Sequence, residues 1–417
     1  MKHMSDYKYH FGLKVRIYPN TTQKKIITAS SNASRFVYNK MVEYSKEISA
    51  FGKPSIYIKV VEERIARLRQ LKKYTTALKD TFPWLCAKEI DNLAIENAKQ
   101  NYQKAWNLYW KVHGIAPPNY HKKSYEEKYQ TSAQYDCNRI DIPNMINGRC
   151  KFSKKQIKIP FLGIIRYKGS SERIKKLMEM PEVRIGTITI IKDGCDDYYA
   201  SFQLASDDMF VEELPKTGSQ VGIDLNIRNF LADNEGNIVD NPHYFRRARK
   251  RLAKVKRKLG KRAARAKKEN RALVTAKNYQ KQRKIVAKIT RSVMNRRRNF
   301  LHIQSRALIN NNDLVVAEEL RSKNMVKNHA LASSIYDSSW RTFLNMMTYK
   351  SELYGRTFKT VNPRNTTQTC SNCGHILKGK DKLTLNDDDW TCPICREYHH
   401  RDVNAAKNIL AKGLNVV

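Results

Sequence analysis

The sequence predicts an α/β protein of several domains, and three observations lead to that class. The chain has 417 residues, which suits two to four domains at roughly 150 residues each. Segments that alternate with period two, as strands do, are separated by segments whose apolar residues recur every three or four positions, as on a helix face. The composition, with 41% apolar and 10% aromatic residues, excludes a disordered polyelectrolyte.

The first half of the chain predicts a helical domain inserted into a β-rich module. Residues 7–18 alternate as a strand, and residues 23–113 follow a helical pattern. Short β-branched runs follow over about 116–215, including a hairpin whose strands lie within 183–191 and 198–204. We expect the opening strand to pair into this later β-rich module.

The second half of the chain alternates strands with helices. Residues 221–225 read as a buried strand, with hairpin partners at 230–233 and 238–239. A second apolar run, 314–317, precedes two consecutive acids, and residues 403–410 suit a short packed helix.

The net charge is the strongest compositional signal. The chain has 79 Lys and Arg against 39 Asp and Glu, which leaves a formal charge of +40. Such a charge is self-repelling unless a polyanion neutralises it, so nucleic acid is the natural partner. No apolar run approaches the roughly 20 residues of a spanning helix, and the N-terminus lacks the apolar core of a signal peptide. We therefore expect a soluble intracellular protein with no membrane partner.

More than half of the excess charge lies in one segment. Residues 246–298 contain 24 Lys and Arg but one acid, Glu269, and their apolar spacing predicts a helical hairpin with its turn around 260–270. A solvated helix face usually carries both signs, so this bias favours phosphate contacts. We expect these side chains to bind nucleic acid: Arg249, Lys250, Lys256, Arg257, Lys261 and Arg262.

Four of the eight cysteines form two close pairs. Two residues separate the members of each pair and eighteen separate the pairs, a spacing typical of a structural four-thiolate zinc site, with ligands Cys370, Cys373, Cys392 and Cys395. Reduced surface knuckles or a redox dithiol are the alternatives. His375 and His399 could substitute as ligands, but we expect them on the surface or behind the sulfurs. The scattered cysteines, Cys86, Cys137, Cys150 and Cys195, predict no function.

Acidic residues stand in or beside three apolar segments. Asp224 lies within the buried strand, Glu318 and Glu319 follow the second apolar run, and Asp402 begins the last helix. An isolated Asp in such a strand is as often a capping or turn residue. Three carboxylates together could instead hold two divalent cations about 3.5 to 4 Å apart and cleave phosphodiesters.

Several ordered strings resemble the TnpB (OrfB) proteins of insertion sequences, the compact relatives of type V CRISPR nucleases. The resemblance covers most of the chain and includes Phe11 to Gln23 and the Lys-rich strip after Pro117. Its most specific strings are Gly222-Ile223-Asp224-Leu225, Val316-Ala317-Glu318-Glu319-Leu320, residues 338–350, Asn365 to Cys370, and Arg401 to Ile409.

The resemblance implies an RNase H-like RuvC nuclease domain with an inserted basic helical hairpin and a zinc ribbon, preceded by a β-barrel wedge domain that contains a helical recognition lobe. The corresponding boundaries are 1–22 and 116–216 for the wedge, 23–115 for the recognition lobe, 217–364 and 399–417 for the nuclease, with the hairpin at 246–298, and 365–398 for the zinc ribbon.

The implied function is RNA-guided cleavage of double-stranded DNA beside a short flanking motif. By motif match, Asp224, Glu318 and Asp402 would bind two catalytic Mg²⁺ ions, with Glu318 preferred to Glu319, and the cysteines would bind one structural Zn²⁺. The partners would be a guide RNA derived from the transposon end and double-stranded target DNA, bound at the nucleoid of a prokaryotic cytoplasm. The sequence leaves the oligomeric state open, with a monomer favoured. The alternatives are a nuclease-inactive, RNA-guided repressor and a transposase that joins strands.

Two positions depart from the family pattern, and one aromatic cluster is ambiguous. Asn226 stands where many relatives have Gly, and His400 where the family often has Asp. Tyr102, Tyr109 and Trp110 could stack on bases, although their helical spacing favours core packing.

Overall fold

The structure is a computed structural model that describes residues 2–51, 59–136, 138–319, 339–384 and 387–415. Cys137 and the motif residues Leu320 and Ser338 lie outside those ranges. The chain divides into two compact units, residues 1–210 and 211–417, and each is described by itself. Among the described helices, none is long and apolar enough to cross a membrane.

Most helices of the first unit share an apolar core. They are α1 (Thr21–Phe51), α2 (Lys59–Lys73), α3 (Thr75–Thr81), η2 (Pro83–Cys86) and α4 (Asn92–Lys111), while the short η1 (Met4–Asp6) buries no side chain. Side chains such as Val37, Leu68 and Ile95 are completely buried between α1, α2 and α4. The Asp91 side chain caps α4 by accepting the backbone N–H of Leu93 at 2.9 Å. The helical pattern expected for residues 23–113 is therefore confirmed where the structure describes it.

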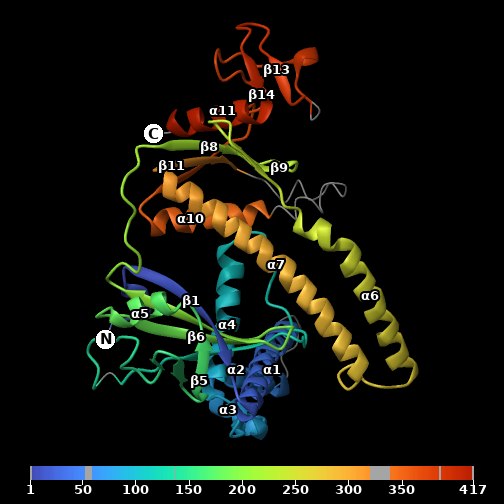
Figure 1. The fold of residues 1–417 in the computed structure, drawn as a ribbon. Coiled ribbons are helices and arrows are strands. Elements are labelled where there is room, and N and C mark those ends of the chain that lie inside the picture. The colour runs from blue at the N-terminus through green and yellow to red at the C-terminus, as the bar shows by residue number, and fades with distance from the viewer. Residues whose placement is uncertain (1, 52–58, 137, 320–338, 385–386, 416–417) are drawn as a thin grey trace. The chain divides into compact units, whose positions relative to one another are not determined.

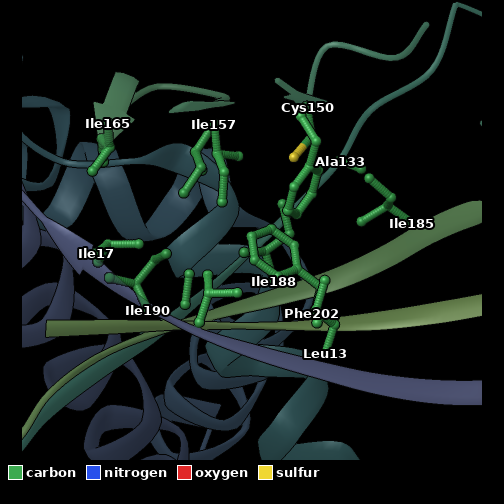
Figure 2. Close-up of a cluster of buried hydrophobic side chains, with 14 of the residues drawn as sticks. Leu13, Ile17, Ala133, Cys150, Ile157, Ile165, Ile185, Ile188, Ile190 and Phe202 are labelled. Atoms are coloured by element: carbon green, nitrogen blue, oxygen red, sulfur yellow. The ribbon is translucent and has the colours of Figure 1, made fainter. Parts of the chain in front are cut away.

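The strands of the first unit form one antiparallel sheet in the order β2-β6-β7-β1-β5-β4-β3. They are β1 (Tyr9–Tyr18), β2 (Glu127–Ser132), β3 (Lys151–Phe152), β4 (Gln156–Ile159), β5 (Gly163–Lys168), β6 (Arg184–Lys192) and β7 (Tyr198–Ser206), with α5 (Ser171–Glu179) between β5 and β6. Its buried side chains form the core in Figure 2, where Leu13 and Phe202 face the same cluster. Because β1 pairs with both β5 and β7, the expected insertion of helices behind the opening strand is confirmed. Closure of this sheet into a barrel stays a prediction.

The second unit is built on a mixed sheet in the order β10-β9-β8-β11-β12. Its strands are β8 (Gln220–Asp224), β9 (Asn229–Asp233), β10 (Ile238–Asp240), β11 (Leu314–Glu318) and β12 (Thr357–Val361). The first three strands are antiparallel neighbours, whereas β11 runs parallel to both β8 and β12. At the end where these parallel strands begin, the buried Arg356 pairs with Asp313 at 2.6 Å and also bonds to the Pro215 carbonyl at 2.6 Å.

Helices cover both faces of this sheet (Figure 1). The helices are α6 (Tyr244–Lys268), α7 (Lys277–Asn311), α10 (Trp340–Leu353) and α11 (Arg401–Asn415), and the shorter elements are η3 (Gly379–Asp381), β13 (Asp389–Thr391) and β14 (Tyr398–His400). Strand alternation sorts the side chains: Ile223 and Ala317 face α7 and α10, while Val316 faces Ile409 of α11. The unit is therefore a three-layer α/β structure.

The basic hairpin has its turn later in the chain than the sequence suggests. Gly260, expected near the turn, lies inside α6, and the connection between the helices spans 269–276. The flanking Lys, Arg and Ala residues are strong helix formers and offset the roughly 1 kcal/mol cost of one glycine. The second helix also continues to Asn311, because Leu301 and Ile309 pack against the sheet.

Gly222 lets α11 lie directly on β8. A Cβ at this position would stand 2.7 Å from Cβ of Leu410 and closer still to the carbonyl oxygen of Ala406. On the helix side, a Cβ at Gly413 would meet Val316 at 2.5 Å. Two glycines therefore set the distance between the helix and the two central strands.

We expect Gly222→Ala to lower the free energy of unfolding by about 1–3 kcal/mol, because the strand and helix backbones must separate. Chemical denaturation monitored by circular dichroism measures the change. Gly260→Ala is the matched control, since nothing lies within 4 Å of its added Cβ and it should raise stability by about 1 kcal/mol. Equal stability of Gly222→Ala and the unmodified chain would contradict the close-approach argument.

Candidate functional site

The parallel pairing of β8 and β11 places two acids side by side. Ile223 is the register partner of Ala317, so the next residues of the two strands, Asp224 and Glu318, are neighbours. Gly222 and Val316 both face α11. Asp224 and Glu318 each stand two residues later on their strands, so both side chains point to that same face of the sheet. Both are half-buried, whereas Glu319 is exposed on the opposite side of the alternation.

Helix α11 brings the third acid to this edge of the sheet. Asp402 lies in the first turn of the helix, where a negative charge is favourable, and is 7% exposed. The Asn226 side chain donates to its Oδ2 at 2.7 Å, and the Arg401 guanidinium lies 3.2 Å from its Oδ1. Asn226, one of the two departures from the family pattern, thus orients Asp402, which the resemblance implies is a metal ligand.

The three carboxylates interact electrostatically. The pKa of Asp224 is raised well above its ordinary value, first by burial and then by the negative charges of Glu318 and Asp402. Burial also raises the pKa of Glu318, against the opposing effects of the Thr366 hydroxyl and the Lys412 ammonium. The structure therefore concentrates negative charge where a cation would relieve the repulsion.

The acids are spaced more widely than the ligands of a single ion. Among the described residues, four cysteines form the one group of three or more potential ligands whose atoms all lie within 4.8 Å of one another. The acid trio is not such a group.

The four cysteine sulfurs converge as a tetrahedral site requires. Cys370 and Cys395 sulfurs lie 3.6 Å apart, as do those of Cys373 and Cys392. Four thiolates around one zinc ion, with bonds of about 2.3 Å, would have sulfurs roughly 3.8 Å apart. The donor set and its spacing therefore fit a closed, structural metal site.

Each cysteine pair lies on a turn that ends in a left-handed residue. Gly374 follows the first pair with φ of 75°, and Arg396 follows the second with φ of 60°. Backbone N–H groups in these turns stabilise the anionic sulfur: the amide of Glu397 is the main cause that lowers the pKa of Cys395 to about 6. His399 is buried with Nε2 at 3.1 Å from Sγ of Cys370, so it lies behind the sulfurs as expected.

Two buried asparagines of α11 join the cysteine segment to the acids. Asn404 donates to the Thr369 carbonyl and accepts from the Ser371 amide, both at 2.8 Å, on either side of Cys370. One turn later Asn408 donates to the carbonyls of Thr366 at 2.8 Å and Thr369 at 2.6 Å. The expectations from the sequence include no role for these asparagines, although their spacing of four on an otherwise apolar helix face is a usable signal.

Thr366 completes this connection. Its hydroxyl contacts Oε1 of Glu318, while its carbonyl is held by Asn408. The segment that precedes Cys370 is therefore bonded both to the strand acid and to the helix that carries Asp402.

The basic residues expected to bind nucleic acid lie along α6. Five of the six are exposed, namely Arg249, Lys250, Lys256, Arg257 and Lys261. Arg262 is half-buried and donates to the Asn278 carbonyl at 2.7 Å, so it also joins α6 to α7.

Three family models match successive parts of the chain. The OrfB IS605 "Helix-turn-helix domain" matches residues 9–53, the OrfB IS605 family described as "Probable transposase" matches 201–329, and the "Cas12f1-like, TNB domain" matches 340–409. The last range contains both cysteine pairs, Asp402 and the asparagine pair.

Similarity to individual proteins extends over almost the whole chain. A Streptomyces pristinaespiralis protein named "Putative RNA-guided DNA endonuclease" is 29% identical, covering 97% of this chain and 89% of that protein. The Escherichia coli K12 protein "Putative RNA-guided DNA endonuclease InsQ" is 23% identical, covering 96% and 92%. The resemblance to the TnpB (OrfB) family is thereby confirmed.

The fold is also similar to that of a solved effector. The chain in the structure titled "Cryo-EM structure of the Cas12f1-sgRNA-target DNA complex" superposes with a TM-score of 0.53 at 15% identity, covering 96% of this chain and 98% of that chain. This likeness supports a shared mixed α/β architecture.

We expect Asn408→Ala to lower the free energy of unfolding by about 1–3 kcal/mol, because two carbonyls lose their buried donor. Urea denaturation measures the loss. Lys407→Ala, an exposed change one position away, serves as the control and should stay within about 0.5 kcal/mol of the unmodified chain. Equal effects of the two substitutions would argue against the bridging role of Asn408.

Proposed function

We propose that this protein is an RNA-guided endonuclease that cuts double-stranded DNA beside a short flanking motif. The observation that carries the proposal is the placement of Asp224 and Glu318 at neighbouring strand ends, with Asp402 on the helix that crosses them. The names of the relatives support the same activity.

The three carboxylates are proposed as ligands of two Mg²⁺ ions. Carboxylate oxygens are the hard donors that Mg²⁺ prefers. The pKa of Asp224 is raised because burial and the charges of Glu318 and Asp402 disfavour its ionised form, a cost that a bound cation would offset. When bound, two such Mg²⁺ ions would activate the attacking water and stabilise the leaving oxygen of a phosphodiester. The chain's own residues fix the donors: Asn226 orients Asp402, and Thr366 contacts Glu318.

The domain assignment follows the same proposal. The three-layer unit, as 217–364 and 399–417, would be the RuvC-like nuclease, and 365–398 the zinc ribbon held by four thiolates. Residues 1–22 and 116–216 would be the wedge, with 23–115 as the recognition lobe. The asparagine pair supports a structural role for the ribbon, since its hydrogen bonds tie that segment to α11.

The proposed partners are a guide RNA from the transposon end and the target DNA. Sequence would be read by pairing with the guide, and the protein would contact backbones and duplex shape. The exposed cations of α6 supply the required charge, since residues 246–298 carry a net +23. The repressor alternative is less well supported, because cleavage gives a physical reason for three carboxylates at one edge of the sheet.

Asp224→Ala should abolish cutting while leaving guide-dependent DNA binding largely intact. Loss of several kcal/mol of metal-assisted transition-state stabilisation corresponds to about three powers of ten in rate. Cleavage of a matched plasmid with co-purified RNA and Mg²⁺, alongside a gel-shift assay, measures both properties. Binding without any cleavage by the unmodified protein would instead establish the repressor function.

Two matched substitutions test which of the adjacent acids, Glu318 or Glu319, is the metal ligand. Glu318→Gln should reduce cleavage by at least about 100-fold, because a neutral amide is a poor ligand for a hard cation, whereas exposed Glu319→Gln should leave the rate nearly unchanged. The reverse result would assign the ligand to Glu319.

Cys370→Ser should remove bound zinc and lower thermal stability, because closed thiolate sites contribute folding free energy. Elemental analysis of purified protein should find one zinc per chain before the substitution and much less after it. The exposed Cys86→Ser is the control and should keep both zinc and stability. Active unmodified protein that contains no zinc would disprove the assignment.

A further inference from the structure

The last turns of α4 carry a ladder of aromatic rings that reaches the surface. Tyr102 is buried at 3% exposure, Trp106 is half-buried and Trp110 is 74% exposed. The Trp106 and Trp110 rings are stacked, with centroids 6.1 Å apart and planes 23° from parallel. Tyr109 packs edgewise on Trp110 at 4.9 Å. The core-packing interpretation is therefore right for Tyr102 but wrong for Trp110.

The ladder is anchored at its buried end. The Tyr102 hydroxyl is hydrogen-bonded to Ser45, and its ring packs edgewise against Tyr38 at 5.7 Å between centroids. Trp106 in turn packs edgewise on Tyr102. A surface ring held by such neighbours loses little side-chain freedom on binding, which makes it an effective contact.

The charges near the aromatic ladder favour a negatively charged ligand. Residues 97–125 contain five lysines and no acid, and Lys104 and Lys111 are exposed on the same helix. This combination suits a ligand with flat rings and negative charges. A second copy of the chain is disfavoured as the occupant, because two surfaces of the same positive sign repel.

We propose that Trp106, Tyr109 and Trp110 form a stacking platform for an unpaired nucleobase. The base stacks on the outer face of Trp110 and extends the Trp106–Trp110 pair, while Lys104 and Lys111 contact the flanking phosphates. The ligand is a single-stranded segment, either RNA or displaced DNA. The proposal deepens the proposed function and rests on its nucleic-acid partners, but it does not require cleavage.

Fluorescence anisotropy with labelled oligouridine and oligothymidine of about 12 nucleotides tests the platform in the full chain, without Mg²⁺. Trp110→Ala should weaken binding roughly 5- to 100-fold, the range that one base–aromatic stack supplies. Trp110→Phe should retain most of the affinity because it keeps a ring. The control Leu108→Ala removes another exposed apolar side chain from the same helix, where Leu108 is 50% exposed, and should have little effect.

Two further readouts separate stacking from charge. An abasic oligomer of equal length should bind the unmodified chain and Trp110→Ala with the same affinity. Trp110→Ala should leave the slope of affinity against salt concentration unchanged, whereas Lys111→Ala should reduce that slope by about 0.7. If Trp110→Ala weakens oligouridine binding more, the platform binds RNA. If it weakens oligothymidine binding more, the platform binds displaced DNA.

Three outcomes would overturn the proposal. They are unchanged affinity of Trp110→Ala, an equal loss on the abasic oligomer, and a dimer of the unmodified chain that dissociates on this substitution. Because the assay needs neither guide nor cutting, failure of the nuclease proposal would leave its result unaffected. Conversely, a negative result here with normal plasmid cleavage would overturn the platform alone.

Discussion

The close contact of α11 with β8 and β11 is the constraint on which the second unit depends. Gly222 and Gly413 remove the two Cβ atoms that would hold the layers apart. The same face of the two strands then ends in Asp224 and Glu318, at the point where the helix begins with Asp402. Strand alternation, the parallel register and the close approach of α11 to the sheet thus bring acids to one edge although up to 178 residues of chain separate them.

The cysteine cluster and the acids form one hydrogen-bonded structure. Asn404 and Asn408 hold the backbone that precedes and follows Cys370, and Thr366 reaches Glu318 from that same segment. The segment that carries Cys370 is therefore connected to the carboxylates by a short chain of hydrogen bonds. A substitution that loosens the cysteine segment is therefore expected to disturb the carboxylates as well.

Local pattern predicted most elements of this fold, because alternation and helical spacing are properties of short segments. The hairpin of β6 and β7, the acid-bearing strand β8 and the helix after Asp402 all lie where the sequence places them. The turn after α6 was missed because Gly260 is a weak helix breaker among strong helix formers. The roles of Asn404, Asn408 and Asn226 depend on partners distant in the chain. The exposure of Trp110 depends on how far along α4 the neighbouring helices pack against it. Periodicity alone contains neither kind of information.

The hairpin of α6 and α7 leaves the sheet after β10 and returns to it at β11, so both of its ends are fixed on the same scaffold. Matched insertions near its tip would extend the arm by about 5.4 Å for each added turn without shifting any strand. The length of this arm can thus evolve independently of the geometry at the carboxylates. Insertions or deletions at its tip would leave Asp224, Glu318 and Asp402 in the same arrangement.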